Sequence, residues 1–302
     1  MKFSSASPLI RRGTPLALLA AGALLFTGCA PTSQAAEGDI HNVTVGTGEL
    51  SPVNDVISEV AKEHGINVEW QSFSDWTLPN QALAHGESDV NAFQHLAFLS
   101  AYNVAENQDL TPVGSTQITT WGIFSDKYDS VDAIPDGATI AIPNDPSNSA
   151  RTLFLLQQAG LITLAKDVGI YPTVDDITQN SKNLKFSPIV AQQLVNVYKD
   201  VDAIVVGTAT IDQALSITKD KALAIDDPNA KSSLPYVNVV AVRGEDADSE
   251  VYRELAKSWK DPRVLEAIKE ESKDNSIVVD IPVEQLRETL TELEDLARGL
   301  EK

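Results

Sequence analysis

The order of apolar and polar positions along the chain predicts strands that alternate with helices. Residues 43–47 (VTVGT) alternate apolar and polar side chains as a strand does, and residues 66–70 (INVEW) repeat the pattern. Between them, Ser51 is placed to cap a helix that starts with proline, and apolar residues recur at helical spacing until Gly65 ends it. A strand, a helix and a second strand form a βαβ unit, which predicts a parallel sheet.

Further elements of both kinds follow, so the predicted fold class is α/β. The pattern indicates strands at 138–143, 202–207 and 236–242 and helices at 149–159, 188–199, 249–258 and 283–299. Segments 116–125 and 226–238 carry turn residues and are candidate crossings between two lobes. If the chain crosses twice, one lobe holds residues 41–118 and 235–302, and the other holds residues 119–234.

The start of the chain has the composition of an export signal. Residues 1–28 contain three basic residues and no acid, and their apolar run at 15–26 is too short to span a bilayer comfortably. The run ends in LFTGC, which predicts a lipoprotein signal peptide over 1–28, lipidation at Cys29 and a small, polar tether over 29–40. The protein would then be anchored to the cell membrane on its extracytoplasmic side. The alternative is an ordinary signal cleaved nearby, with Cys29 incidental.

Charge and missing motifs exclude several classes of protein. Asp and Glu number 43 against 23 Lys and Arg, so the formal charge is −20, which disfavours nucleic acid as a partner. The single cysteine excludes an internal disulfide. The sequence has no nucleophile elbow, no phosphate-binding loop and no zinc-protease motif, and its 4 histidines are scattered. We therefore expect no enzyme, no metal and no cofactor.

Polar and aromatic residues gather in three stretches at the ends of predicted elements. Residues 72–99 are rich in aromatics, which could simply be core. In residues 142–162 a strand ends and a helix begins, and Arg151 falls in the expected first turn, where the helix dipole disfavours a cation. A bidentate carboxylate contact would explain that arginine, and a solvated side chain is the alternative. In the third stretch, PYVN, Asn238 could offer a donor and an acceptor to a zwitterion or merely cap a turn.

Together these stretches resemble the MetQ/NlpA family, the substrate-binding lipoproteins of methionine ABC importers. The matching segments are FSDWTLPNQAL (73–83), DVNAFQH (89–95), IPNDPSNSAR (142–151), LLQQAGLI (155–162), NLK (183–185) and PYVN (235–238). The resemblance implies a type II periplasmic-binding-protein fold with a ligand cleft between its two lobes. It also implies a membrane permease and its ATPase as partners, no catalytic activity and no cofactor.

The resemblance also implies roles for individual residues. The family's arginine that meets the ligand α-carboxylate is Arg151 here, and the asparagine that holds the ligand's polar end is Asn238. The residues expected to wall the rest of the pocket are Trp76, Phe93, His95, Phe98 and Asn148.

Three features depart from the family pattern. Gly207 stands where the family usually has an asparagine that contacts the ligand. Trp76 and Phe98 replace tyrosines, and Thr119 stands where an aromatic is frequent, with Trp121 two residues later. The expected function is capture of L-methionine, and also D-methionine, for import. The alternatives are a methionyl dipeptide or another apolar amino acid on the same scaffold, a surface-anchored hydrolase, and an adhesin or structural lipoprotein.

Overall fold

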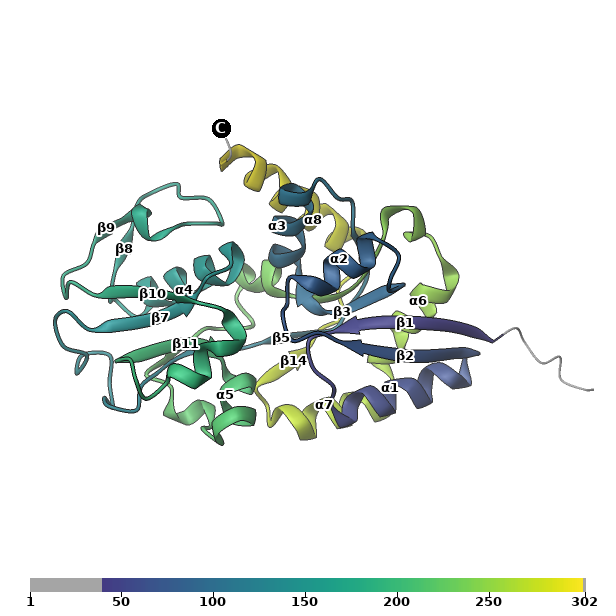
Figure 1. The fold of residues 1–302 in the computed structure, drawn as a ribbon, viewed down its shortest axis with the longest axis horizontal. Helices are drawn as coiled ribbons and strands as arrows, with labels where there is room; N and C mark the ends of the chain where they lie inside the picture. The colour runs from purple at the N-terminus through teal and green to yellow at the C-terminus, as the bar shows by residue number, and fades with distance from the viewer. Residues whose placement is uncertain (1–39, 301–302) are drawn as a thin grey trace, which may run out of the picture. The chain divides into compact units, whose positions relative to one another are not determined.

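The computed structural model describes residues 40–300 of the chain (Figure 1). The predicted signal peptide, Cys29 and all of the predicted tether except Ile40 lie outside these residues. The described residues belong to one compact unit and build two five-stranded sheets, each of which forms the centre of a lobe. No helix among them combines the length and the apolar composition needed to cross a membrane.

The first sheet has the strand order β2-β1-β3-β13-β4. Its strands are β1 (His41–Thr47), β2 (Ile66–Ser72), β3 (Val90–His95), β4 (Thr111–Ser115) and β13 (Asn238–Val242). Strand β1 runs parallel to β2 and β3, as the βαβ pattern predicted, whereas β13 runs antiparallel to β3 and β4. The late strand β13 therefore returns the chain to the lobe that its first strands began.

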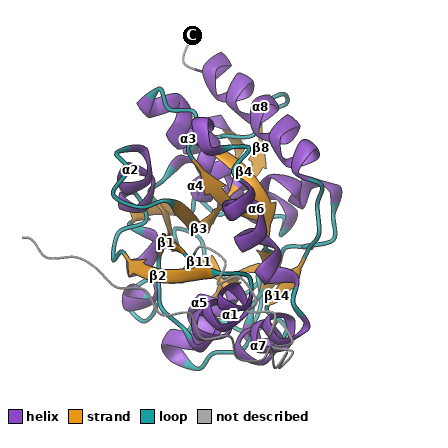
Figure 2. Cartoon of the chain, turned by 90° about the vertical axis from the view of Figure 1, so that its right-hand side faces the viewer, coloured by secondary structure: helices purple, strands orange, loops and turns teal. Residues whose placement is uncertain are grey.

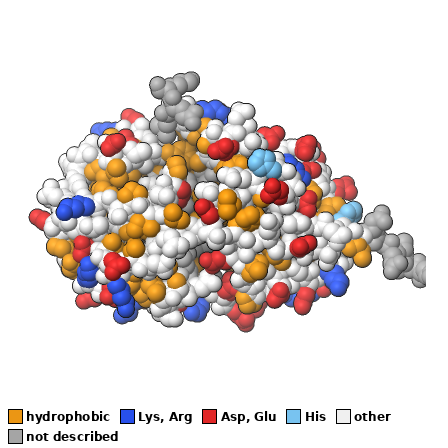
Figure 3. Space-filling model, viewed as in Figure 1, with side chains coloured by type: hydrophobic (Ala, Val, Ile, Leu, Met, Phe, Trp, Pro, Cys, Tyr) orange, Lys and Arg blue, Asp and Glu red, His pale blue; other side chains and the backbone are white. Residues whose placement is uncertain are grey.

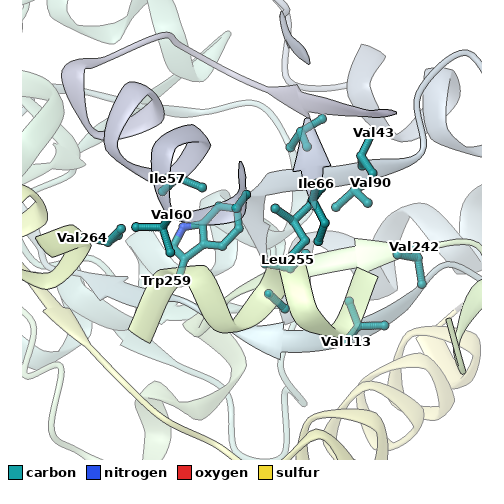
Figure 4. Packing of buried hydrophobic residues seen from close by; sticks show 14 of the residues in the cluster. Val43, Ile57, Val60, Ile66, Val90, Val113, Val242, Leu255, Trp259 and Val264 are labelled. Carbon is teal, nitrogen blue, oxygen red and sulfur yellow. The ribbon is translucent and has the colours of Figure 1, made fainter. Parts of the chain in front are cut away.

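Helices cover both faces of this sheet (Figure 2). They are α1 (Pro52–Glu63), α2 (Leu78–Ala84), α3 (Leu96–Glu106), α6 (Glu250–Lys257), α7 (Pro262–Ser272) and α8 (Val283–Leu300). On one face, α1, α6 and α7 enclose an apolar cluster in which Trp259 lies beside Val60 and Val264 (Figure 4). On the other face, α2, α3 and α8 bury a second cluster that includes Leu99 and Leu290. Burial of this apolar surface stabilises the lobe.

The second sheet has the strand order β10-β7-β11-β6-β12. Its strands are β6 (Trp121–Phe124), β7 (Thr139–Pro143), β10 (Lys185–Ile189), β11 (Ala203–Gly207) and β12 (Ala224–Ile225). Strand β7 is parallel to β10 and β11, while β6 is antiparallel to β11 and β12. The lobe also contains α4 (Pro146–Gln158), α5 (Thr208–Leu215) and a small sheet of β8 (Thr163–Leu164) and β9 (Ile177–Gln179).

Short 3₁₀ helices fill several connections between these elements. They are Val174–Asp176, Ala191–Val197, Lys219–Lys221, Lys231–Tyr236, Gly244–Asp246 and Ser258–Lys260. The predicted α-helix at 188–199 is wrong, because β10 extends to Ile189 and only a 3₁₀ helix follows. Pro188 lies in β10, whose partner β7 is more than forty residues away, so pairing between distant segments overrides the local pattern here.

The segments between the lobes are more numerous than the sequence indicated. The predicted crossing at 116–125 contains β5 (Gln117–Thr119), which pairs antiparallel with β14 (Ser276–Val278), far along the chain. All strands of the first sheet lie within 41–118 and 235–302, and all strands of the second within 119–234. These boundaries themselves stay a prediction, because the described residues form one compact unit.

Acidic side chains lie across much of the face seen in Figure 3 and do not gather in one patch. This distribution agrees with the formal charge of −20, which describes the whole chain.

Candidate ligand-binding site

A cavity of about 540 Å³ is lined by residues of both lobes. The first lobe contributes the turn after β1, the end of β3, the start of α3 and the start of β13. The second lobe contributes the start of α4 and the end of β11. All seven residues expected at the ligand line this cavity: Trp76, Phe93, His95, Phe98, Asn148, Arg151 and Asn238. Their contacts to a ligand remain a prediction.

His95 joins the two lobes through a hydrogen bond whose direction can be derived. Its Nδ1 accepts the backbone N–H of Phe98 at 3.1 Å, so Nδ1 carries no proton and Nε2 carries it in the neutral ring. Nε2 lies 3.1 Å from Oδ1 of Asn148 and therefore donates to it. Burial, with a smaller contribution from the nearby charge of Arg151, lowers the pKa of His95 to about 3. The imidazole is thus neutral and both of its nitrogens are occupied.

Asn148 is oriented by the residue that caps its helix. Asp145 precedes α4 and its Oδ1 accepts the backbone N–H of Asn148 at 2.9 Å. The other carboxylate oxygen accepts Nδ2 of Asn148 at 3.0 Å, so the amide oxygen must face His95. The loop sequence PNDPSN therefore builds both the helix start and the polar contact between the lobes.

Arg151 is buried in the cavity wall with only 4% of its side chain exposed. Its Nε and Nη2 donate to Oδ2 of Asp226 at 2.9 and 2.6 Å, and Nη2 also donates to the carbonyl of Thr119 at 2.8 Å. The guanidinium carbon lies 4.5 Å from the ring centre of Tyr236 and 5.2 Å from that of Trp121. Within residues 40–300 its Nη1 donates to no acceptor, so one pair of N–H groups remains available on a fixed cation.

The reason given from sequence for the position of Arg151 was wrong. The helix begins at Pro146 and not at residue 149, because Asp145 supplies the cap. Arg151 therefore lies in the second turn, where the unpaired N–H groups of the helix start no longer act on it. Asp226 holds the side chain instead. Burial lowers the pKa of Arg151, and the carboxylate of Asp226 opposes that shift.

Asp226 is the main residue of the site that the sequence did not identify. Besides binding Arg151, its Oδ1 accepts the backbone N–H of Trp121 at 2.8 Å, and its own N–H donates to the carbonyl of Trp121 at 2.9 Å. The available signal was an acidic pair at the start of the predicted second crossing, 226–238. Nothing in the local sequence distinguishes Asp226 from its exposed neighbour Asp227, because the partner of Asp226 is 75 residues away.

Another part of the cavity lining is aromatic and reaches Arg151 through Tyr236. Phe93 and Phe98 meet edge to face with ring centres 5.9 Å apart, and His95 meets Phe98 and Tyr236 in the same way at 6.2 and 5.3 Å. Trp76 is half-buried and lines both this cavity and an adjoining one of about 530 Å³. Tyr236 was not predicted as a site residue, although it belongs to the PYVN motif.

Asn238 presents its amide to the cavity from the first position of β13. Its backbone carbonyl accepts the N–H of Thr116 at 2.8 Å, and its register partner in β3 is His95. In the part of the chain that the structure describes, the side-chain amide of Asn238 makes no hydrogen bond. It therefore offers a donor and an acceptor beside the aromatic wall.

Two α/β lobes that together line one cavity define a substrate-binding protein with a type II periplasmic-binding-protein fold, as predicted. The model of the NlpA lipoprotein family matches residues 42–279, and the chain belongs to this family. The family prediction made from the motifs is therefore confirmed.

Relatives with names and a solved structure agree with this assignment. The chain is 39% identical to Lipoprotein 28 of Escherichia coli strain K12 over 259 residues, which cover 84% of this chain and 92% of that protein. It is 35% identical over 251 residues to the D-methionine-binding lipoprotein MetQ of the same strain, with coverage of 82% and 90%. A nutrient binding protein from Burkholderia cenocepacia, solved bound to methionine, is similar with a TM-score of 0.74 and 37% identity, covering 78% of this chain and 99% of that one.

Proposed function

We propose that this protein is the substrate-binding lipoprotein of an ABC importer and that it captures methionine. The observation that supports this most is the pairing, in one cavity, of a buried arginine with an open Nη1 and a wall of aromatic rings. A zwitterion with an apolar tail fits these two ends. The similarity to proteins named for methionine binding adds to the argument.

In the proposed complex, the ligand carboxylate accepts from Nη1 of Arg151 and the amide of Asn238 binds the polar end. The thioether lies against Trp76, Phe93 and Phe98, where each sulfur–aromatic contact is worth roughly 0.3–1.5 kcal/mol. The charged end needs fixed donors, because burial of an unpaired charge costs far more than these contacts return. Asn148 acts through His95, whose ring it holds.

Capture without chemistry suits the electrostatics of the cavity better than hydrolysis does. Among the described residues, His95 is the one histidine that lines it; both of its nitrogens are engaged and its pKa is lowered to about 3, so it is a poor general base. We therefore propose that the protein is not an enzyme. Binding draws the lobes together, and the closed form delivers methionine to a membrane permease driven by a cytoplasmic ATPase.

The remaining parts of the proposal concern the ends and the division of the chain. Residues 1–28 are the signal peptide, Cys29 carries the lipid, and residues 29–40 tether the protein to the outer surface of the cell membrane. Homologues named as lipoproteins support this anchoring. The lobes are residues 41–118 with 235–302, and residues 119–234.

Calorimetric titration of the mature chain tests the proposed function. The panel is L-methionine, D-methionine, leucine and a methionyl dipeptide, and we expect methionine to bind with a Kd in the micromolar range or tighter. Absence of binding by every ligand below about 1 mM, which corresponds to roughly −4 kcal/mol, would reject the proposal.

A methionyl dipeptide is the second candidate ligand, and one observation favours it. The adjoining cavity of about 530 Å³ shares Trp76, Gly48 and Leu50 with the main cavity, so a longer ligand could extend past the indole toward solvent. If the dipeptide binds more tightly than methionine in the same titration, the ligand is a peptide and the scaffold assignment stands.

A further inference from the structure

Gly207 and Trp121 face each other across two strands at the cavity. Gly207 ends β11, Trp121 begins β6, and the two are register partners in the antiparallel pair. Both line the cavity. The missing side chain of Gly207 and the large side chain of Trp121 therefore shape the same part of the cavity.

The indole N–H of Trp121 lies next to the position that a side chain on Gly207 would occupy. A Cβ atom placed on Gly207 would lie 3.6 Å from Nε1 of Trp121 and 3.3 Å from Oγ1 of Thr210. A methyl group would fit with a small shift of Thr210. A longer side chain such as asparagine would start from that Cβ, with the indole nitrogen and the Thr210 hydroxyl as its nearest polar neighbours.

The indole N–H of Trp121 is a donor without an acceptor within residues 40–300. Trp121 as a whole is buried, with 7% of its surface exposed, but its indole nitrogen keeps accessible surface and the residue lines the cavity. Its backbone is fixed on both sides by Asp226, and its ring lies against the guanidinium of Arg151 at 5.2 Å. The open donor therefore belongs to the same cavity wall as the open Nη1 of Arg151.

We propose that the indole N–H of Trp121 donates a hydrogen bond to the carboxylate of the bound amino acid, and that Gly207 keeps this place clear. Trp121 and Gly207 then form one specificity element, in which a tryptophan across the sheet supplies the donor that a side chain at 207 would otherwise supply. One carboxylate oxygen accepts from Arg151 and the other from Trp121. This inference rests on the proposed function.

Titration of four proteins with L-methionine tests the pair. Trp121→Phe keeps an aromatic ring beside Arg151 but removes the N–H together with one ring of the indole, and loss of a hydrogen bond to a charged group corresponds to a loss of affinity of about 10-fold or more. Gly207→Asn in the presence of Trp121 is expected to weaken binding as well, because the amide and the indole compete for space. The double variant Trp121→Phe/Gly207→Asn is expected to bind within about 3-fold of the wild type.

Tyr171→Phe is the control. Tyr171 is buried away from the residues that line the cavity, and its hydroxyl donates to the carbonyl of Ala97 at 2.9 Å, so its removal should lower thermal stability without changing methionine affinity. Trp121→Phe should lower the melting temperature as well, because Trp121 is buried in the core of the second lobe, and the fall in methionine affinity is the result that separates it from the control.

Two results would overturn the inference while leaving the proposed function intact. One is unchanged affinity in Trp121→Phe, and the other is tighter methionine binding in Gly207→Asn alone, which would mean that the glycine merely lacks a donor. If the folded wild type binds no amino acid or dipeptide, the proposed function fails and this inference fails with it.

Discussion

At the polar end of the cavity Arg151 is held by Asp226 and by the carbonyl of Thr119, whereas the aromatic end relies on edge-to-face contacts of Phe93 and Phe98. The polar end comes mainly from the second lobe, and the aromatic end comes from the first. Most of the cost of burying the cation is therefore met within the protein, and one pair of donors is left for the ligand. The aromatic end is less directional and tolerates different apolar tails.

The largest expected effect comes from removal of the cation. Arg151→Ala should weaken methionine binding by about 2–5 kcal/mol, because a ligand carboxylate would lose its charged partner. Arg151→Lys is the control, since it keeps the charge but cannot hold Asp226 and the ligand with one planar group, and it should also bind poorly. Calorimetry measures both. Affinity within threefold of the wild type for Arg151→Ala would show that the polar end does not meet the ligand.

Removal of the partner carboxylate should act first on stability. Asp226→Ala leaves Arg151 buried without its counter-ion and should lower the free energy of unfolding by about 3 kcal/mol. Asp227→Ala, at the exposed neighbouring residue, should cost much less. Denaturant unfolding without ligand compares the two variants. Equal losses would mean that the ion pair adds nothing beyond the local turn.

The stability of the folded protein should depend on pH through His95, which links the two ends of the cavity. The pKa of His95 is lowered from its ordinary value of 6.5 to about 3, so below pH 6.5 the unfolded chain takes up a proton that the folded chain refuses. The contribution of the neutral His95 to the free energy of unfolding is complete above pH 6.5. It is lost as the pH falls, by roughly 2 kcal/mol between pH 7.5 and pH 5. Unfolding measurements at both pH values give this change.

His95→Gln is the control for this pH dependence. Glutamine can accept from Phe98 and donate to Asn148 without titrating, whereas the carboxylates titrate in both proteins. The difference between the two pH profiles therefore isolates the histidine. Profiles that run parallel from pH 7.5 to pH 5 would contradict the assigned neutral state.

The smallest expected effect lies at the aromatic end. Phe98→Leu keeps an apolar side chain and removes one ring, so methionine affinity should fall by about 0.3–1.5 kcal/mol. Norleucine, which has a methylene group in place of the sulfur, should lose less. Titration of both ligands tests whether the ring is selective for sulfur, and equal losses would reduce its role to burial.

Much of the fold could be predicted where the signal is local. Ser51, Gly65 and the apolar spacing between them placed α1 between two parallel strands, and the positive φ of Gly65 (74°) is the conformation that glycine permits at a helix end. Helix α7 carries equally local signals, a capping Asp261 followed by Pro262, and was within reach although it was not predicted. The start of α4 was ambiguous, because several residues in PNDPSNS can cap a helix.

The sequence by itself determined the class of this protein, through its alternating pattern and its motifs, and it named seven residues that the fold brings to one cavity. Only the tertiary structure decided which group holds Arg151, which turn of α4 that arginine occupies, and that Trp121 stands opposite Gly207. Helix caps and apolar periodicity depend on neighbours a few residues away, so they can be recognised in the chain itself. The Arg151–Asp226 and Trp121–Gly207 pairs span 75 and 86 residues, and such contacts arise only when strands from distant segments align.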